Sequence, residues 1–148
     1  MIHRGKSPTD IHSGKYNGLG GKLEAGEDPQ AGVVREVLEE SGLKIRNPQL
    51  VGTLTFPKFK DNEDWYVYVY IASEFSGQLR SCAEGEVSWI NDSQILDLPL
   101  WEGDKVFLPL LYSGNFFSGS FTYVDKKLVA KQCYVYEQCP GEIIKCIE

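Results

Sequence analysis

The sequence predicts an α/β layered domain, because one short chain contains several strand patterns mixed with two helix patterns. A helix is predicted over residues 29–41, and a second over residues 104–112 that Pro109 interrupts or bends. Segments rich in β-branched and aromatic residues are predicted to be strands. They cover residues 49–56, 65–72, 86–90, 116–124 and 128–136.

The first helix has signals at both ends. Asp28 is a favourable N-cap residue, and Pro29 suits the first helical position. Val34 and Leu38 recur at helical spacing, and Gly42 follows as the C-cap glycine. The boundaries of this helix are therefore the best defined in the chain.

The remaining segments read as turns, loops and one strand end. Residues 1–4 resemble the end of a strand, and residues 5–15 and 23–28 are predicted to be loops. Residues 16–21 form a glycine-dense turn, and residues 61–64 an acidic turn between strands. Asp125 and Lys126 are expected to join the last two strands in a hairpin.

Length and composition indicate one soluble domain. The chain has 148 residues, of which 42% are hydrophobic and 24% charged. No apolar run approaches the ~20 residues of a membrane span, and the N-terminus lacks the apolar stretch of a signal peptide. We therefore expect a cytoplasmic protein without a membrane partner.

The charge balance restricts the partners. The formal net charge is −6, and the sequence pI is about 5.0. An acidic surface repels phosphate backbones, so binding to polymeric nucleic acid is not expected. A small polyanionic substrate would need a metal ion to offset the same repulsion.

The cysteines give no zinc signature. Cys82, Cys133, Cys139 and Cys146 form no C-x-x-C pair, and only two histidines accompany them. Reduced thiols are expected from the compartment. A bridge among the three cysteines near the C-terminus after oxidation is the alternative.

A carboxylate cluster marks the first helix. Glu36 and Glu40 lie about 40° apart on one helical face, and Glu39 borders that face. Glu27 precedes the helix and can fold toward it. A divalent cation with a preference for hard oxygen ligands, Mg²⁺ or Mn²⁺, would relieve the repulsion. The alternative is a solvated acidic face, but Gly32 within the helix suggests a close approach of another group.

Here the sequence resembles the Nudix hydrolases. Their motif reads G, five residues, E, seven residues, then R-E-U-x-E-E-x-G-U, where U is aliphatic. The matching residues are Gly21, Glu27, Arg35, Glu36, Val37, Glu39, Glu40, Gly42 and Leu43. Every position of the motif matches, so the chain is identified as a member of this family.

The resemblance implies the Nudix fold, an α/β/α sandwich with a mixed sheet, and a metal held against a pyrophosphate. Glu36, Glu39 and Glu40 would be metal ligands or the catalytic base. Arg35 would orient a carboxylate of the motif and Glu27 would support the site. The carbonyl of Gly20 and the carboxylate of Glu84 would be further ligands, although Glu84 is equally well a solvated loop residue.

The likeness extends to enzymes of the MutT type that act on oxidised purine triphosphates. It covers residues 16–22, 100–104, 107–111 and 116–121. In that subfamily an Asn and an Asp bind the purine edge and a Trp covers its face, and Asn17, Asp104 and Trp101 match. The alternatives are a core aromatic for Trp101 and a helix N-cap for Asp104.

Two cations complete the expected substrate site. Lys22 is expected to contact a phosphate, and Arg4 is a second candidate whose alternative is an ordinary surface cation.

The resemblance therefore implies Mg²⁺-dependent hydrolysis of a small nucleotide, 8-oxo-dGTP or a similar compound, to the monophosphate and pyrophosphate. Mn²⁺ is the alternative ion. Alternative substrates are ADP-ribose, nucleotide sugars, dinucleoside polyphosphates and capped RNA. A nucleotide-binding module without turnover and a structural protein with an acidic helix are the alternatives outside this chemistry.

The ends of the chain differ from the relatives. The relatives carry most of a first strand before the part that matches residues 2–4, so the first strand is expected to be truncated. Reduced stability or a homodimer would follow from an open sheet edge. Residues 138–148 extend beyond the usual end and are expected to add a strand or cover an edge.

Overall fold

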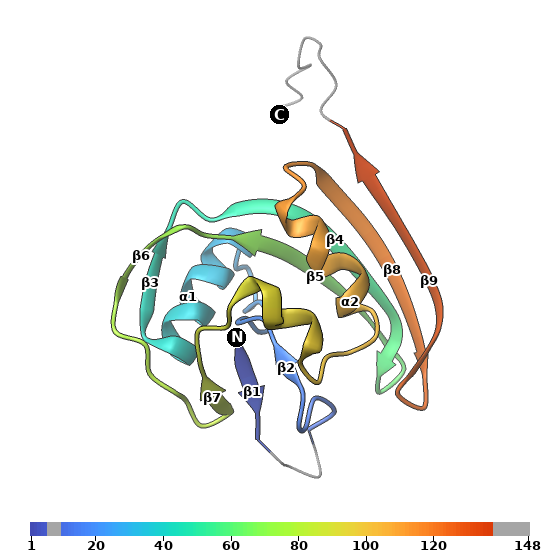
Figure 1. Ribbon diagram of the computed structural model, residues 1–148, viewed down its shortest axis with the longest axis horizontal. Helices are drawn as coiled ribbons and strands as arrows, with labels where there is room; N and C mark the ends of the chain where they lie inside the picture. Colours follow the sequence, from blue (N-terminus) through green and yellow to red (C-terminus); the bar gives the residue numbers. More distant parts are fainter. Residues whose placement is uncertain (6–9, 138–148) are drawn as a thin grey trace.

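The computed structural model describes residues 1–5 and 10–137. The elements are β1 (Ile2–Arg4), β2 (Tyr16–Asn17), α1 (Pro29–Ser41), β3 (Leu43–Arg46), β4 (Gln49–Lys60), β5 (Glu63–Ile71), β6 (Glu74–Gly77), β7 (Gly85–Val87), the 3₁₀ helix η1 (Asp92–Asp97), α2 (Asp104–Phe107), the 3₁₀ helix η2 (Leu108–Tyr112), β8 (Phe116–Val124) and β9 (Lys127–Tyr136). The described part of the chain begins and ends in strands, with α1 near its start and the helical segments η1, α2 and η2 before the last two strands (Figure 1).

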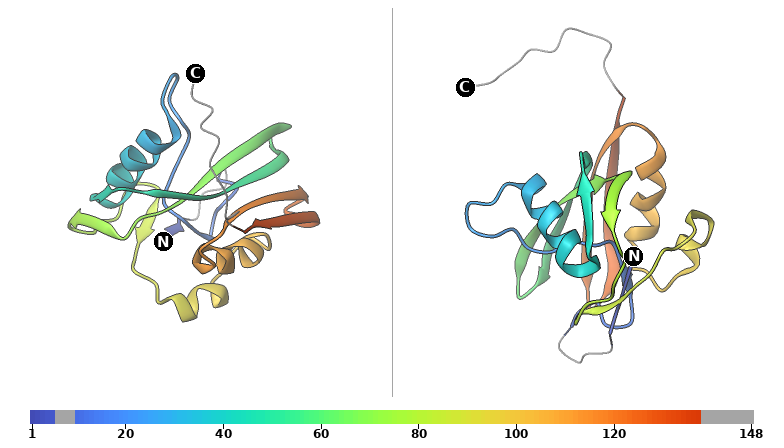
Figure 2. Two further views of the ribbon diagram at one scale, coloured as in Figure 1. Left: turned by 90° about the horizontal axis from the view of Figure 1, so that it is seen from above. Right: turned by 90° about the vertical axis from the view of Figure 1, so that its left-hand side faces the viewer.

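The largest sheet has the strand order β5-β4-β8-β9 and is mixed. β4 pairs with β8 in parallel, whereas the β4–β5 and β8–β9 pairs are antiparallel. The predicted hairpin between the last two strands is confirmed, with its turn at Asp125 and Lys126. Figure 2 shows α1 and α2 on opposite sides of the strands, which is the expected α/β/α arrangement.

Two smaller sheets contain strands that the sequence did not predict. β3 pairs with β6, and β2 lies in the segment predicted to be a turn and pairs with β1. These strands have two to four residues, so they carry too little pattern to be recognised before their partners are known. β1 also pairs with β7. It has partners on both sides and is not the open edge that a truncated first strand suggested.

The predicted boundaries of α1 are confirmed. The Asp28 side chain accepts hydrogen bonds from the backbone N–H groups of Gln30 and Ala31. Gly42 ends the helix at φ 73°, and its N–H donates to the Leu38 carbonyl. A Cβ atom at Gly32 would overlap the Leu23 side chain, so the loop before the helix is the group that approaches there.

Two predicted elements differ in extent. The helix expected over residues 104–112 is α-helical only in α2 and continues as the 3₁₀ helix η2, because Pro109 cannot donate a backbone hydrogen bond. The acidic turn is shorter than predicted. Asp61 and Asn62 form this turn with φ values of 54° and 62°. β4 ends directly before it, and β5 begins directly after it.

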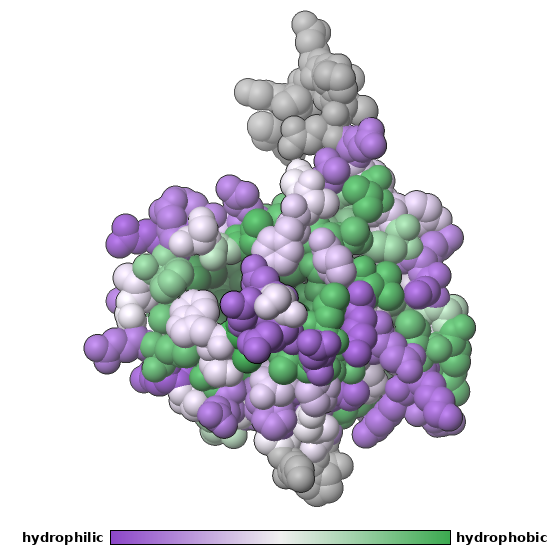
Figure 3. Space-filling model, in the orientation of Figure 1, coloured by the Kyte–Doolittle hydropathy of each residue, from purple (hydrophilic) through white to green (hydrophobic). Residues whose placement is uncertain are grey.

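The hydrophobic core lies between the large sheet and the α2–η2 segment. Leu54, Phe117, Phe121 and Tyr123 contribute from the strands, and Trp101 from the segment before α2. Along β8, buried and partly exposed residues alternate, as in a strand with one face on the core. On the β8–β9 side hydrophobic residues also reach the surface (Figure 3), among them the exposed Val129 and Val135.

The described part of the chain contains no helix that is both long and apolar enough to cross a membrane. Cys82 and Cys133 are free thiols. Cys139, Cys146 and the predicted extension over residues 138–148 lie outside the described residues.

Candidate active site

Arg35 joins the loop before α1 to the helix itself. Its Nε and Nη2 atoms donate to the two carboxylate oxygens of Glu27 at 2.8 and 2.9 Å, a bidentate pair. Its Nη1 atom donates to Glu36 at 2.8 Å, and Nη2 also donates to the Lys22 carbonyl at 3.1 Å. One guanidinium therefore fixes the loop, the helix and the Glu36 carboxylate relative to one another.

Both members of the Arg35–Glu27 pair stay charged. Hydrogen bonds from Arg35 and from the Glu24 N–H lower the pKa of Glu27 to about 2. Hydrogen bonds to Glu27 first and to Glu36 second raise the pKa of Arg35 above its ordinary value. Glu27 thus acts as a fixed anion that holds Arg35.

The backbone at Gly21 lies directly against Glu36. A Cβ atom at this position would overlap the Glu36 carboxylate, so only glycine allows the contact. Glu36 is consequently confined between Gly21 and Arg35. Glu39, by contrast, has a side chain that is 60% exposed and lies 3.5 Å from Arg35 Nη1.

Glu40 is the buried carboxylate of the site, with 5% of its surface exposed. The Gly20 N–H donates to its Oε2 atom at 2.8 Å, and Arg4 Nη1 lies 3.8 Å from its Oε1 atom. Burial, with repulsion from Glu84 and Glu36, raises the pKa of Glu40 to about 7 against the opposing effects of Gly20 and Arg4. This carboxyl group therefore needs additional positive charge to ionise fully at neutral pH.

Arg4 lies among the carboxylates rather than on the open surface. Its Nη1 atom contacts Glu84, and its Nε atom donates to Asp10 at 3.0 Å. The side chain is 20% exposed. The sequence-based alternative of an ordinary surface cation is therefore wrong, and Arg4 is one of the charged groups of the site.

The residues predicted to bind the base lie at β2 and at the start of α2. Asn17 pairs with Ile2 across β1 and β2. Asp104 is the first residue of α2 and accepts a hydrogen bond from the Trp101 N–H at 3.2 Å. The N-cap of α2 is Gly103, so the alternative of an N-cap role for Asp104 is wrong.

Burial raises the pKa of Asp104 to about 6, although the Trp101 N–H and the Lys15 charge lower it. Trp101 is 6% exposed and belongs to the core cluster, as the alternative for this residue required. Its role in covering a purine face stays a prediction.

A family model and a related protein identify the family to which this chain belongs. Residues 1–111 match the family model described as NUDIX domain. An uncharacterised Nudix hydrolase of Bacillus subtilis, YvcI, is 36% identical over 72% of this chain and 71% of its own length. The chain belongs to the Nudix family.

Two further similarities narrow the type within the Nudix family. The mouse oxidized purine nucleoside triphosphate hydrolase is 32% identical over 84% of this chain and 80% of its own length. The crystal structure of a MutT protein from Bacillus halodurans superposes with a TM-score of 0.70 at 33% identity, over 78% of this chain and 79% of that one. This Nudix protein is therefore MutT-like, and its family membership makes it a pyrophosphohydrolase.

Nudix enzymes generally use divalent metal ions, and the chemistry of the donor set here fits such an ion. Glu36, Glu40 and Glu84 supply hard carboxylate oxygens, and burial, followed by repulsion from Glu84 and Glu36, raises the pKa of Glu40. In the described part of the chain, however, no three His, Cys, Asp or Glu side chains are close enough in this conformation to hold a metal. Arg4 and Arg35 hold these carboxylates instead.

Lys22 is not directed at the carboxylates. Its ammonium lies over the Trp65 ring, 5.8 Å from the centroid. His12 and Lys15 both contact Trp101, although nothing in the sequence around them predicted a role in the site. No local pattern marks these contacts, because they join residues more than eighty positions apart.

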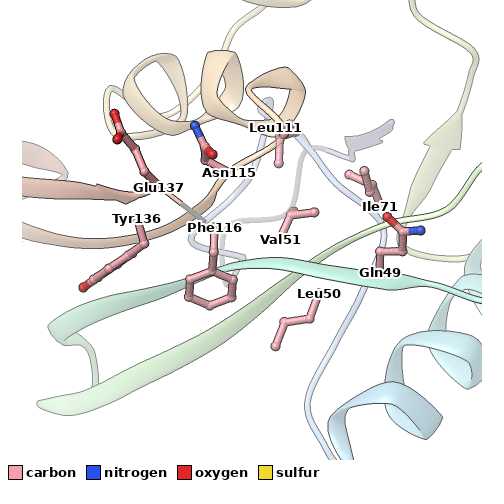
Figure 4. Close-up of a pocket in the computed structure, with 10 residues that line it drawn as sticks. Gln49, Leu50, Val51, Ile71, Leu111, Asn115, Phe116, Tyr136 and Glu137 are labelled. Carbon is pink, nitrogen blue, oxygen red and sulfur yellow. The ribbon is translucent and has the colours of Figure 1, made fainter. Parts of the chain in front are cut away.

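A separate cavity of about 400 Å³ lies where β4 begins and β9 ends (Figure 4). It is lined by the start of β4, the end of η2 and the β8–β9 end that includes Phe116 and Tyr136. None of the residues predicted for catalysis or binding lines it, so it is not part of the Nudix site.

Proposed function

We propose that this Nudix hydrolase acts as a single domain that cleaves an oxidised purine nucleoside triphosphate, 8-oxo-dGTP or a close analogue. The products are the nucleoside monophosphate and pyrophosphate. The observation that carries the hydrolase mechanism is Glu40, a buried carboxylate held by Gly20 and Arg4 beside Glu36 and Glu84. The mouse relative, which is named for oxidised purine triphosphates, supports the substrate class.

The proposed ion is Mg²⁺, with Mn²⁺ as the alternative. Glu36, Glu39, Glu40, Glu84 and the carbonyl of Gly20 would hold it. When bound, the ion supplies positive charge against the phosphate oxygens and helps to generate the attacking hydroxide.

The protein groups have distinct proposed roles. Arg35 and Glu27 keep Glu36 in position through the bidentate pair. One of the three glutamates Glu36, Glu39 and Glu40 would also accept the proton of the attacking water. Arg4 and Lys22 contact the phosphates.

The base site is proposed at Asn17, Asp104 and Trp101. An amide offers both a donor and an acceptor to the purine edge, and the carboxyl of Asp104 can be protonated or ionised near neutral pH. Trp101 offers an apolar ring for stacking. Recognition of an oxidised purine then depends on the hydrogen bonds of Asn17 and Asp104.

Turnover of a nucleotide panel with Mg²⁺ tests the substrate. The panel contains 8-oxo-dGTP, dGTP, ADP-ribose and a dinucleoside polyphosphate, with products identified by chromatography. We expect preference for 8-oxo-dGTP with release of pyrophosphate. Preference for another compound would retain the Nudix chemistry and reject this substrate.

The variant Glu40→Gln tests the catalytic site. We expect kcat to fall by at least about a hundredfold, because the amide can neither carry the negative charge nor accept the proton. Circular dichroism should show the fold retained, since the amide keeps the size of the side chain and can still accept from Gly20. Nucleotide binding without turnover in the wild-type protein would instead support a binding module.

A further inference from the structure

A hydrogen bond between distant residues fixes the orientation of Trp101. The indole Nε1–H donates to Nδ1 of His12 at 3.0 Å, across 89 positions of the chain. The two rings meet edge to face, with centroids 5.9 Å apart and an interplanar angle of 85°. Because an indole has one N–H and no acceptor, this bond uses the whole hydrogen-bonding capacity of the Trp101 side chain.

The surroundings of His12 keep its ring neutral. The rings of Phe59 and Trp65 lie with centroids 6.0 and 6.2 Å from the imidazole centroid. Burial lowers the pKa of His12 below its ordinary value of 6.5. Nδ1 is the acceptor in this bond, so the proton of the neutral ring is on Nε2.

His12 is in turn held by the charged side of the active site. Its backbone N–H donates to Asp10 Oδ1 at 2.9 Å, and Asp10 Oδ2 accepts from Arg4 at 3.0 Å. Arg4 also contacts Glu84 and approaches Glu40. A continuous polar chain therefore connects the carboxylates of the Nudix motif to the proposed base site.

We propose that His12 is a positioning residue for base recognition, because it holds the Trp101 indole so that a purine meets its ring and no donor. This inference rests on the proposed base site. It assigns hydrogen-bond discrimination to Asn17 and Asp104 and leaves stacking to Trp101. The Nδ1 atom of His12 is the required group. A side chain at position 12 that keeps an acceptor there should therefore still orient the Trp101 indole.

Kinetics of two variants test the proposal with the purine triphosphate that the wild-type protein prefers. His12→Ala should raise KM about five- to tenfold, the loss expected for one hydrogen bond and the ring order it maintains, with kcat within twofold. His12→Gln should recover most of the affinity because its amide oxygen can accept. His3→Gln, which changes the other histidine, is the control and should leave KM unchanged.

Nuclear magnetic resonance of the free protein gives a second readout that does not need turnover. The Trp101 indole N–H signal, assigned with Trp101→Phe, should exchange slowly with solvent in the wild type. It should move toward the position of a solvent-exposed indole in His12→Ala. In the wild type the same movement should occur on acidification with a midpoint below pH 6.5, because protonated Nδ1 cannot accept.

Burial has the largest effect on this midpoint and lowers it. Among the charged groups, Asp10 favours the protonated ring, whereas Arg4 and Lys60 oppose protonation. If His12→Ala does not fold, the wild-type titration and His12→Gln decide the matter.

The outcomes separate the two proposals. An unchanged KM in His12→Ala, no recovery in His12→Gln, or an indole signal insensitive to pH would overturn the positioning role alone. A wild-type protein that neither turns over nor binds any purine nucleotide overturns the proposed function as well, whatever the indole signal shows.

Discussion

At the scale of single residues, the site is organised by two guanidinium groups among carboxylates. Arg35 is held by Glu27 and holds Glu36, and Arg4 is shared by Asp10, Glu84 and, at longer range, Glu40. The difference between the acids lies in their environment. Hydrogen bonds from Arg35 and from the Glu24 N–H lower the pKa of Glu27, whereas burial raises the pKa of Glu40. The same residue type therefore serves as a fixed anion in one place and as a group in need of a cation in the other.

Asp104 gives a prediction about stability at this scale. Its pKa in the folded protein is about 6 and its ordinary value is 3.8, so the folded state binds the proton more tightly. Its contribution to stability is complete below about pH 4 and is lost as the pH rises through 6. At pH 7.5 the buried charge costs on the order of 2–3 kcal/mol. We expect Asp104→Asn, which can still accept from Trp101, to melt at a higher temperature than the wild type at pH 7.5 and at a similar temperature at pH 4.

Thermal melts at the two pH values check this expectation. Asp97→Asn, at an exposed position of η1, is the control and should change neither melt. A gain for Asp104→Asn that is equal at pH 4 and pH 7.5 would show that its cause is not the ionisation of Asp104.

At the scale of elements, glycines decide how closely segments approach. Gly21 lets the loop backbone lie on Glu36, and Gly42 ends α1 in a left-handed conformation. Gly52 in β4 faces Phe117 in β8, where these two strands pair in parallel. The first two glycines belong to the Nudix motif, whereas the requirement at Gly52 follows from the packing of two strands that are distant in sequence.

Gly52→Ala should therefore destabilise the sheet. The added Cβ atom would meet ring atoms of Phe117 at 2.5–2.7 Å, and this ring is fully buried and cannot move aside. We expect a loss of about 1–3 kcal/mol in the free energy of unfolding, measured by urea denaturation. The matched control is Gly18→Ala, where no described heavy atom lies within 4 Å of the added atom. Equal effects of the two substitutions would exclude the clash as the cause.

At the scale of the whole molecule, the layers bring both ends of the proposed substrate site together. β1 and β2 carry Arg4 and Asn17, α1 carries three of the motif glutamates, and the segment before α2 carries Trp101. The expected reduced stability and the alternative expectation, a homodimer, stay predictions. Thermal melting tests the first and light scattering the second.

Metal binding should be visible in the stability of the whole molecule. Removal of metal with EDTA should abolish turnover. The protein should stay folded, because its core consists of hydrophobic and aromatic side chains. Addition of Mg²⁺ should raise the melting temperature, because an ion that binds only the folded state stabilises it. The shift should be smaller in Glu40→Gln. An identical Mg²⁺-dependent shift in that variant would argue against Glu40 as part of the ion site.

The sequence by itself determined the family, the boundaries of α1 and the identity of the motif residues, because caps, helical period and motif spacing are local properties of the chain. It also predicted the long strands and the final hairpin. The short strands β2, β3 and β6, the place of Arg4 among the carboxylates and the bond between His12 and Trp101 were decided only by the tertiary structure. Each depends on contacts between segments far apart in the sequence, and the raised pKa values of Glu40 and Asp104 depend on burial that no local pattern contains.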